Sequence, residues 1–303
     1  MSSRNVIVFG PTGAVGSITA LTAHQAGARV TLAMRNPSKP IPALQNLHIP
    51  RVHADLTKPQ TIQHAIHQSN AKHAFIYIVP GSTDAMKSAL ITLKSSGIQS
   101  IVLLSSFSIE NDIHAVSRTD FVPYRHAQAE ISLMNVFGHN GIVVRPAYFA
   151  SNALQMRNGV LGGEVRLPNP DAVLDWIVPG DVGRVCGCIL ARGSRERVVS
   201  LVGAQLLSLR QVIDAISFVV GRDVKVRRIG VEEAVDDVRA KAGLTEGFAR
   251  WYVNNMMGVR SDISLAPAYN GAVGNIYRYT GRRPVTFQEW LEENRRLFEI
   301  QVL

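Results

Sequence analysis

The sequence predicts an α/β protein with a Rossmann-like, doubly wound parallel sheet and a smaller, mainly helical C-terminal part that caps it. Three observations support this class. Short apolar runs alternate with helix-like segments through the first half of the chain, as in right-handed strand–helix–strand units. A glycine-rich turn follows the first apolar run and opens a helix-like segment. After Pro146 the alternation becomes irregular and helical patterns dominate.

The order of the expected elements follows from this periodicity. In the first half we expect strands at residues 6–9, 29–33, 48–53, 73–79, 100–104 and 141–144, and helices at 14–26, 59–68, 84–96 and 124–137. In the second half we expect a loop or hairpin at 158–170 and helices at 181–191, 208–220, 231–242 and 245–257. A capping-box pattern predicts that Thr286 begins the last helix.

The glycine-rich turn has the spacing that a dinucleotide pyrophosphate needs. Gly10 allows the chain to turn, Gly13 leaves room for backbone N–H groups to approach a phosphate, and Gly16 lets the helix lie close to the strand. The helix N-terminus then presents unpaired N–H groups and its positive dipole end to the anion. The residues expected at the pyrophosphate are Gly10, Thr12, Gly13, Ala14, Val15 and Gly16.

The second expected strand ends without an acidic residue. NAD-binding chains usually place Asp or Glu there to bind the ribose 2′-hydroxyl, whereas this chain continues Met34-Arg35-Asn36. No carboxylate repels a 2′-phosphate, and the planar guanidinium of Arg35 is suited to bind one, with Ser38 and Lys39 close by. NADP(H) is therefore the expected cofactor. We divide the chain into an NADP-binding Rossmann domain, residues 1–150, and a C-terminal substrate and cap region, residues 151–303, which shares some elements with the first.

Charge and composition indicate the partners. The net charge is +9 and the isoelectric point is near 9.9, but Lys and Arg are scattered and form no recognised nucleic-acid module. We therefore expect a small-molecule substrate and a polyanionic cofactor, not nucleic acid or a membrane. Two cysteines, Cys186 and Cys188, are two positions apart in a helix-like stretch, so their side chains point in different directions and cannot easily bridge. His64 and His67 lack further ligands for a metal. Without a signal peptide or a stretch of transmembrane length, the expected location is the cytoplasm.

Several segments share their pattern with one known family. They are GPTGAVG at 10–16, Arg35, HADL at 53–56, LSS at 104–106, VRPAYF at 144–149 and GRRPVTFQEW at 281–290. With them the chain resembles the NmrA-like family of the atypical short-chain dehydrogenase/reductases. The resemblance implies NADP(H) binding, with the glycine loop on the pyrophosphate, Arg35 on the 2′-phosphate, and Asp55 and Leu56 beside the adenine. Members include NADPH-dependent reductases, quinone reductase-like enzymes and cofactor-sensing regulators.

The usual proton relay of the wider superfamily is incomplete in this chain. Its reductases use a Tyr and a Lys four residues later, where the cation lowers the pKa of the phenol. Here Tyr124 is followed four residues later by Gln128, and the segment 126–130 also lacks the single Lys that nearer relatives often have. The remaining proton donors are Tyr124 and His126, with Glu130 one helical turn further on to orient the histidine. The alternative to a catalytic role is that Tyr124 packs against or caps the helix, and that His126 lies on the helix surface.

Other candidate site residues follow the ends of the expected strands. Ser105 and Ser106 stand where a superfamily catalytic Ser lies, with satisfaction of backbone groups as the alternative. Trp176, Trp251 and Tyr252 are candidates for lining an apolar pocket, with core packing as the alternative. We expect catalysis from Tyr124, His126, Ser106 and Gln128, cofactor contacts also from Asp55, Leu56, Pro80, Gly81 and Ser105, and substrate contacts from Phe107, Tyr148, Phe149, Asn152 and Trp176.

The expected function is NADPH-dependent oxidoreduction of a small apolar carbonyl, enone or quinone-like metabolite. Such electrophiles suit the missing Lys, because hydride attack on a quinone yields a stabilised anion that needs little help from an acid. Two alternatives remain. One is a non-redox isomerase or rearrangement enzyme of a biosynthetic pathway, and the other is an NADP(H)-sensing regulator with a protein partner.

Overall fold

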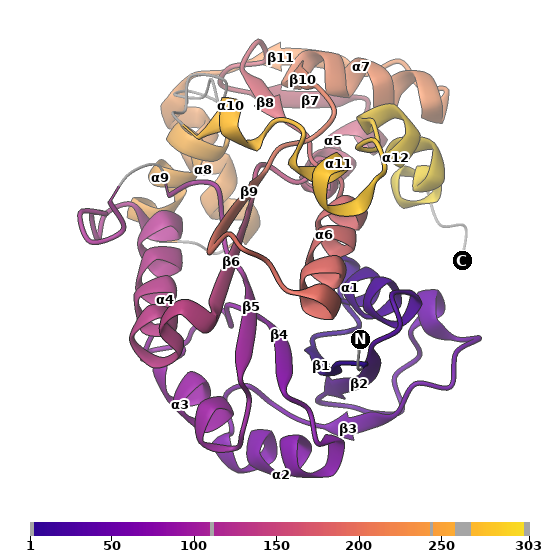
Figure 1. Cartoon of the computed structure of the whole chain (residues 1–303). Coiled ribbons are helices and arrows are strands. Elements are labelled where there is room, and N and C mark those ends of the chain that lie inside the picture. Colours follow the sequence, from indigo (N-terminus) through magenta and orange to yellow (C-terminus); the bar gives the residue numbers. More distant parts are fainter. Residues whose placement is uncertain (1–2, 110–111, 243–244, 258–267, 300–303) are drawn as a thin grey trace.

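The computed structural model describes residues 3–109, 112–242, 245–257 and 268–299, and confirms a Rossmann-like fold (Figure 1). Its main sheet is parallel throughout and has the strand order β3-β2-β1-β4-β5-β6-β9. These strands are β1 (Asn5–Phe9), β2 (Arg29–Met34), β3 (Arg51–His53), β4 (His73–Tyr77), β5 (Ser100–Leu104), β6 (Gly141–Pro146) and β9 (Val198–Leu201). The order reverses between β1 and β4, which is where open α/β sheets bind ligands.

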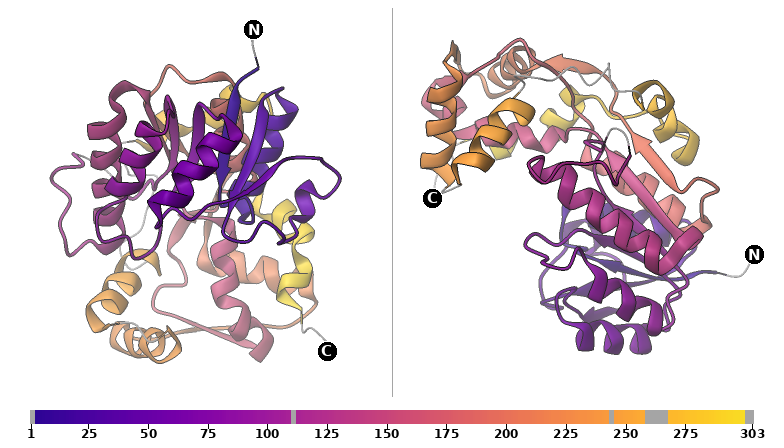
Figure 2. Two further views of the ribbon diagram at one scale, coloured as in Figure 1. Left: turned by 90° about the horizontal axis from the view of Figure 1, so that it is seen from below. Right: turned by 90° about the vertical axis from the view of Figure 1, so that its left-hand side faces the viewer.

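Helices cover both faces of this sheet. On one face lie α1 (Ala14–Gln25) and α6 (Pro179–Arg192), and on the other α2 (Pro59–Ser69), α3 (Lys87–Ser95) and α4 (Phe121–Phe137) (Figures 1 and 2). Alternate side chains of β1 enter the two apolar cores, with Val6 and Val8 toward α1 and α6, and Ile7 and Phe9 toward the other layer. Burial on both faces explains why the strands are nearly continuous apolar runs.

Two glycines on α6 bring it unusually close to α1. A Cβ at Gly183 would lie 2.7 Å from the Val15 carbonyl oxygen, and one at Gly187 would lie 2.6 Å from the Cβ of Thr22. Only glycine therefore permits this separation between the two helix axes. The contact positions α1, whose first turn carries the predicted pyrophosphate site, against an element from the second half of the chain.

Two element boundaries differ from the sequence prediction for local reasons. The third strand was expected at 48–53 but begins at Arg51, because Pro50 has no N–H to continue the ladder toward β2; its carbonyl accepts from the Leu32 N–H. Helix α3 begins at Lys87 instead of residue 84. Ala85 and Met86 take positive φ values of 52° and 66°, and the Asp84 carboxylate accepts the N–H of Ser88.

The second half forms a cap beyond the carboxyl end of β6 (Figures 1 and 2). Its strands are β7 (Glu164–Leu167), β8 (Val173–Asp175), β10 (Leu206–Ser208) and β11 (Lys225–Arg228). Its helices are α5 (Arg157–Gly162), α7 (Leu209–Val220), α8 (Val231–Ala242), α9 (Glu246–Met256) and α12 (Phe287–Glu293). The short helices α10 (Tyr269–Ala272) and α11 (Asn275–Thr280) instead pack against β9 and α6 in the core of the main sheet. Short 3₁₀ turns are η1 (Pro42–Leu44), η2 (Gly138–Asn140), η3 (Ala150–Met156) and η5 (Arg295–Phe298).

The cap differs from the prediction mainly in its strands. The loop or hairpin expected at 158–170 is a short helix, α5, followed by β7, and β7 pairs in parallel with the distant β11. The capping box at Thr286 is confirmed, because its hydroxyl accepts the Glu289 N–H at 3.2 Å and the Glu289 carboxylate accepts the Thr286 N–H at 2.9 Å. Helix α6 and strand β9 come from beyond residue 150 yet complete the main sheet and its cover.

Two further sequence observations concern cysteines and membranes. Cys186 and Cys188 are both free and buried, and burial raises the pKa of each thiol. Within the described ranges, no helix combines the length and apolarity that crossing a bilayer requires.

Candidate functional site

The glycine loop lies at the carboxyl edge of the sheet and is shaped by close backbone packing. Gly10 has a φ of +68°, and a Cβ there would lie 2.6 Å from the Tyr77 ring. A Cβ at Gly16 would lie 2.2 Å from the Gly10 carbonyl oxygen, so any other residue would push α1 away from the loop. The structure confirms the turning role of Gly10 and the close-packing role of Gly16.

Gly13 has no such structural reason to be glycine. It is the N-cap of α1, it is exposed, its φ is −83°, and the nearest atom to an added Cβ is the Gly10 oxygen at 3.5 Å. Thr12 and Ala14 beside it are also exposed, whereas the Val15 side chain is buried in the core. The open space in front of Gly13 therefore fits a phosphate approaching the backbone N–H groups at the start of α1.

The loop after β2 is held in place by the partly buried side chain of Arg51 in β3. The Arg51 guanidinium donates to the carbonyl oxygens of Pro37 at 3.1 Å and Lys39 at 3.0 Å, while Arg35 itself is exposed. Asp55 follows β3 near Arg35. Hydrogen bonds from Thr57 lower the pKa of Asp55, and the charge of Arg35 adds to the effect. Arg35 thus remains solvent-accessible at the carboxyl end of β2, while Leu56 is buried.

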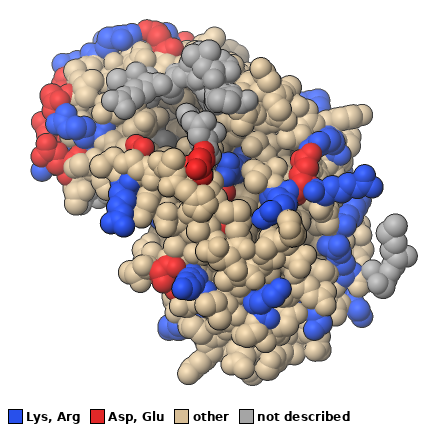
Figure 3. All heavy atoms as spheres, turned by 60° about the vertical axis from the view of Figure 1, so that its left-hand side comes forward, with Lys and Arg blue, Asp and Glu red and all other residues tan. Residues whose placement is uncertain are grey.

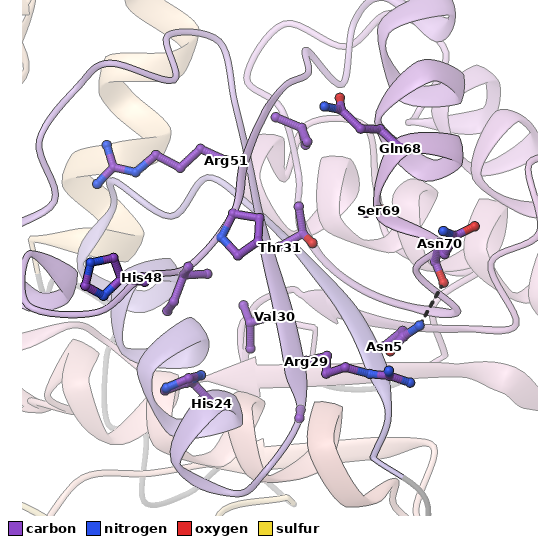
Figure 4. A pocket seen from close by; sticks show the side chains of 14 residues that line it. Asn5, His24, Arg29, Val30, Thr31, His48, Arg51, Gln68, Ser69 and Asn70 are labelled. Atoms are coloured by element: carbon purple, nitrogen blue, oxygen red, sulfur yellow. Dashed lines mark hydrogen bonds between the residues drawn. The ribbon is translucent and has the colours of Figure 1, made fainter.

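A separate hollow of about 590 Å³ lies at the opposite edge of the sheet (Figure 4). Its walls include the amino ends of β1 and β2, where Asn5 and Arg29 stand, and the end of α2, where Asn70 accepts from the Asn5 amide at 3.4 Å. No residue predicted for the site lines it. The candidate functional site is therefore on the carboxyl edge, not in this hollow.

At the end of β5, Ser105 joins a buried polar cluster. Its hydroxyl donates to the Glu130 carboxylate at 2.5 Å and lies 3.3 Å from Nδ1 of His126. Both partners come from α4. Arg145 of β6 completes the cluster, because its Nε and one terminal nitrogen contact the two Glu130 oxygens at 3.0 and 2.5 Å. Sequence reasoning named Glu130 as the partner of His126, but Ser105 stands between them, and Arg145 was missed.

The cluster determines which nitrogen of His126 carries a proton. Ser105 has one hydroxyl hydrogen and gives it to Glu130, so its contact with His126 requires Nδ1 to be the donor. Nε2 is then free of a proton and can only accept. Burial lowers the pKa of His126 to about 4, and the charges of Arg125 and Arg145 add to this effect. His126 is therefore neutral at pH 7, and its role as an acid stays a prediction.

No hydrogen bond joins the other predicted catalytic residues, all of them in the described part of the chain, to this cluster. The Ser106 hydroxyl contacts that of Ser108 at 2.8 Å, and the Arg118 guanidinium lies 6.0 Å from the centre of the half-buried Tyr124 ring. Gln128 is half-buried one helical turn after Tyr124. Pro80 and Gly81 are exposed in the loop after β4, and Phe107 is buried in the core shared with α1 and α6.

A cavity of about 480 Å³ lies between the start of α4 and the cap. Two of the predicted substrate residues, Tyr148 and Asn152, line it, and so does Tyr252 of α9. Phe149 packs against the core instead, and Trp176 is only 2 % exposed, with its ring 5.1 Å from that of Tyr148. The other lining residues are Val122, Gln155, Met156, Gly159, Glu164, Val165, Arg166, Leu167, Leu209, Val238, Phe248 and Met257.

Four polar residues that line the cavity interact with one another. The Tyr252 hydroxyl donates to the Gln155 side-chain oxygen, and Tyr148 interacts with both Asn152 and Tyr252. Burial raises the pKa of Tyr252 to about 12 and that of Tyr148 further. Both phenols are therefore neutral hydrogen-bond donors at physiological pH. Gln155 was not among the predicted site residues, because nothing in its local sequence distinguishes it from a surface glutamine.

One face of α4 connects the cavity with the Ser105 cluster. Val122 lines the cavity, and His126 and Glu130 follow at intervals of four residues, so the three side chains lie on the same face of the helix. The two parts of the candidate site therefore adjoin along this face, between the end of β5 and the cap.

Comparison with known proteins agrees with this geometry. The NmrA-like family model matches residues 2–291, and the chain belongs to this family. It is 32% identical to the nitrogen metabolite regulation-like protein bik4 of Gibberella fujikuroi over 95% of both chains. It is 24% identical to an NAD(P)H azoreductase of Xenophilus azovorans over 97% of this chain and 99% of the other.

Solved structures show the same fold. The NADPH-dependent quinone oxidoreductase of Escherichia coli, complexed with NADPH, superposes with a TM-score of 0.74 and 15% identity, covering 95% of this chain and 99% of that one. The triphenylmethane reductase of Citrobacter sp., complexed with NADP(H), gives a TM-score of 0.67 and 14% identity over 95% and 99% of the chains. The predicted family and fold class are confirmed.

Proposed function

We propose that this protein is an NADP(H)-dependent oxidoreductase that reduces a small, largely apolar carbonyl, enone or quinone-like compound. The observation that carries the proposal is the 480 Å³ cavity, mostly apolar and supplied with neutral phenols, beside the α4 face that leads to Ser105. A carbonyl compound needs apolar walls for its carbon skeleton and a hydrogen-bond donor for its oxygen. The names of the azoreductase and quinone oxidoreductase relatives support this chemistry.

The carboxyl edge has the features that NADP(H) requires. The open space at Gly13 and the start of α1 would hold the pyrophosphate, and exposed Arg35 would bind the 2′-phosphate. When bound, the reduced nicotinamide supplies a hydride. His126, with Nε2 as an acceptor, would bind a hydroxyl of the cofactor or substrate, not protonate a product.

The site favours acceptors that need little acid catalysis. Tyr124 has no lysine partner at Gln128, and His126 is neutral. The donors that remain are hydroxyl groups, which stabilise developing negative charge on oxygen without giving up their protons completely. Quinones and conjugated enones meet this condition because the anion formed on hydride addition is delocalised.

A turnover assay tests the proposal. NADPH oxidation should be observed with at least one member of a panel of quinones, enones and aldehydes. Tight NADPH binding without oxidation by any of them would refute the reductase function. Product formed from an intermediate without nucleotide consumption would instead indicate the non-redox alternative.

A second candidate is an NADP(H)-sensing regulator that presents its cap to a protein partner. The 32% identity to a regulation-like protein favours it, as does the Ser105 cluster, in which the hydrogen-bonding groups already satisfy one another. This function predicts that both NADP and NADPH bind without turnover. A pull-down with the protein loaded with each form should then recover a partner with only one of them.

Replacement of Arg35 tests the choice of cofactor. A charge-assisted hydrogen bond to the 2′-phosphate contributes about 1.5–3 kcal/mol, or about tenfold or more in affinity. Titration should show that NADPH binds more tightly than NADH, and Arg35→Ala should remove most of the difference. Lys39→Ala, at an exposed position in the same loop, is the control with a smaller effect. Equal NADPH and NADH affinities in the parent protein would contradict the assignment.

A further inference from the structure

The cavity wall supplied by the cap carries a hydrogen-bond donor that can be redirected. The Tyr252 hydroxyl now donates to the side-chain oxygen of Gln155, which is an exposed residue. A hydroxyl hydrogen rotates at little cost, so an oxygen atom entering the cavity can replace Gln155 as its acceptor.

The charges around the cavity disfavour an anion. The charged residues that line it are Glu164 and Arg166. The charge of the Arg166 guanidinium is already offset by Glu233 and, at 3.5 Å, by Asp237, both of α8. Its Nε is buried without a hydrogen-bond partner, so it can donate to an uncharged oxygen as well as to an anion. Figure 3 shows acidic side chains interleaved with basic ones at the upper left, over α8 and α9. A carboxylate or phosphate in the cavity would lose its hydration without gaining an unpaired cation, whereas a neutral carbonyl would not meet this cost.

We infer that Tyr252 is the residue that binds the carbonyl oxygen of the substrate, and that the cavity selects neutral carbonyl compounds over anionic ones. The statement that the bound carbonyl compound is a substrate rests on the proposed function. The binding of a neutral carbonyl compound at Tyr252 does not, and it is tested separately. The cap thereby supplies, from α9, the oxygen-binding phenol that the Tyr124 and Gln128 pair on α4 is poorly equipped to provide.

Binding of two matched probes without nucleotide tests the inference. Benzalacetone is a neutral aryl enone, and cinnamate has nearly the same shape with a carboxylate in place of the methyl ketone. By isothermal titration calorimetry, the parent protein should bind benzalacetone about tenfold or more tightly than cinnamate, because the anion finds no free cation. Tyr252→Phe should weaken benzalacetone binding about fivefold, the usual effect of one lost hydrogen bond.

Two further variants control for indirect effects. Tyr279→Phe removes a phenol that contacts the Ser194 hydroxyl at 2.8 Å outside the cavity, and should leave benzalacetone binding unchanged. Gln155→Met removes the competing acceptor of Tyr252 and should tighten benzalacetone binding, a gain that misfolding does not produce. Unchanged binding in Tyr252→Phe, tighter binding of cinnamate, or failure of both probes to bind would each overturn the inference.

The turnover assay separates this inference from the proposed function. Suppose that Tyr252→Phe weakens benzalacetone binding, but that none of the acceptors in the panel supports NADPH oxidation by the parent protein. The carbonyl-binding site is then supported and the reductase function is refuted. If the parent reduces acceptors and Tyr252→Phe does so with unchanged KM and kcat, the reductase function stands and the role of Tyr252 falls.

Discussion

The sheet half and the cap place their ion pairs in different environments. In the sheet half, Glu130 is 2 % exposed and Arg145 13 % exposed, and the pair lies directly beneath Ser105. In the cap, the pairs of Arg250 with Glu232 and of Arg228 with Asp171 are more than two-fifths exposed on both sides. The same chemical interaction is thus buried at the candidate site and solvated in the cap.

The buried ion pair orients neighbouring side chains, whereas the exposed ion pairs contribute only weakly to stability. Burying a charged pair costs several kcal/mol of hydration, which only good geometry and further hydrogen bonds offset. The Glu130 pair has both, and its result is a fixed hydrogen-bonding direction at Ser105 and His126. Exposed pairs contribute about 0–1 kcal/mol each, so the outer cap helices depend mainly on a small apolar cluster that includes Ala234, Val235 and Ala249.

The largest effect is expected when the buried pair is broken. Glu130→Gln leaves the Arg145 charge without its carboxylate in a nearly closed site, and should lower the free energy of unfolding by about 3–5 kcal/mol. The same substitution at exposed Glu232 should change it far less. Urea unfolding of both variants at pH 7 provides the comparison, and equal losses would contradict the distinction between the two environments.

The next effect depends on pH. Asp175 is fully buried, and although Gly203 donates to both its oxygens at 2.8 Å, burial raises its pKa from 3.8 to about 7. Its stabilising contribution is therefore complete below about pH 4 and is lost as the pH rises to about 7.

Asp175→Asn should remove this titration. The unfolding free energy of the variant minus that of the parent should increase by about 2–3 kcal/mol between pH 5 and pH 8, given about 1.4 kcal/mol per unit of pKa shift. Taking the difference cancels the opposite contribution of buried His126, whose lowered pKa makes acidification destabilising in both proteins. A difference that does not vary with pH would show that Asp175 is ionised in the folded state throughout this range.

The smallest effect tests how the halves are joined. Gly183→Ala would place a Cβ 2.7 Å from the Val15 carbonyl oxygen, and should lower the free energy of unfolding by about 1–3 kcal/mol because α6 must move away from α1. Gly271→Ala on α10 meets no atom within 4 Å and should instead stabilise the protein by about 0.4–1 kcal/mol. Thermal unfolding of the two variants should therefore shift in opposite directions.

The sequence by itself determined the features that depend on neighbouring residues. Alternation of apolar runs and helix patterns predicted the parallel sheet, because strand and helix periods are local properties. The turning glycine at 10, the close-packing glycine at 16 and the Thr286 cap were also predicted, since a tight turn and a helix end each depend on a few consecutive residues. Pro50 was visible too, but its shortening of β3 becomes evident only against the ladder of β2.

The tertiary structure alone decided which distant residues meet. Ser105 and Glu130 are 25 positions apart and Glu130 and Arg145 are 15 apart, and no periodic pattern signals that β5, α4 and β6 bring them together. In the same way Tyr148, in the loop after β6, and Tyr252 of α9 line one cavity, and β7 finds its partner in β11. The physical reason is that such contacts are selected by burial and hydrogen-bond satisfaction across the whole fold, which local propensities do not contain.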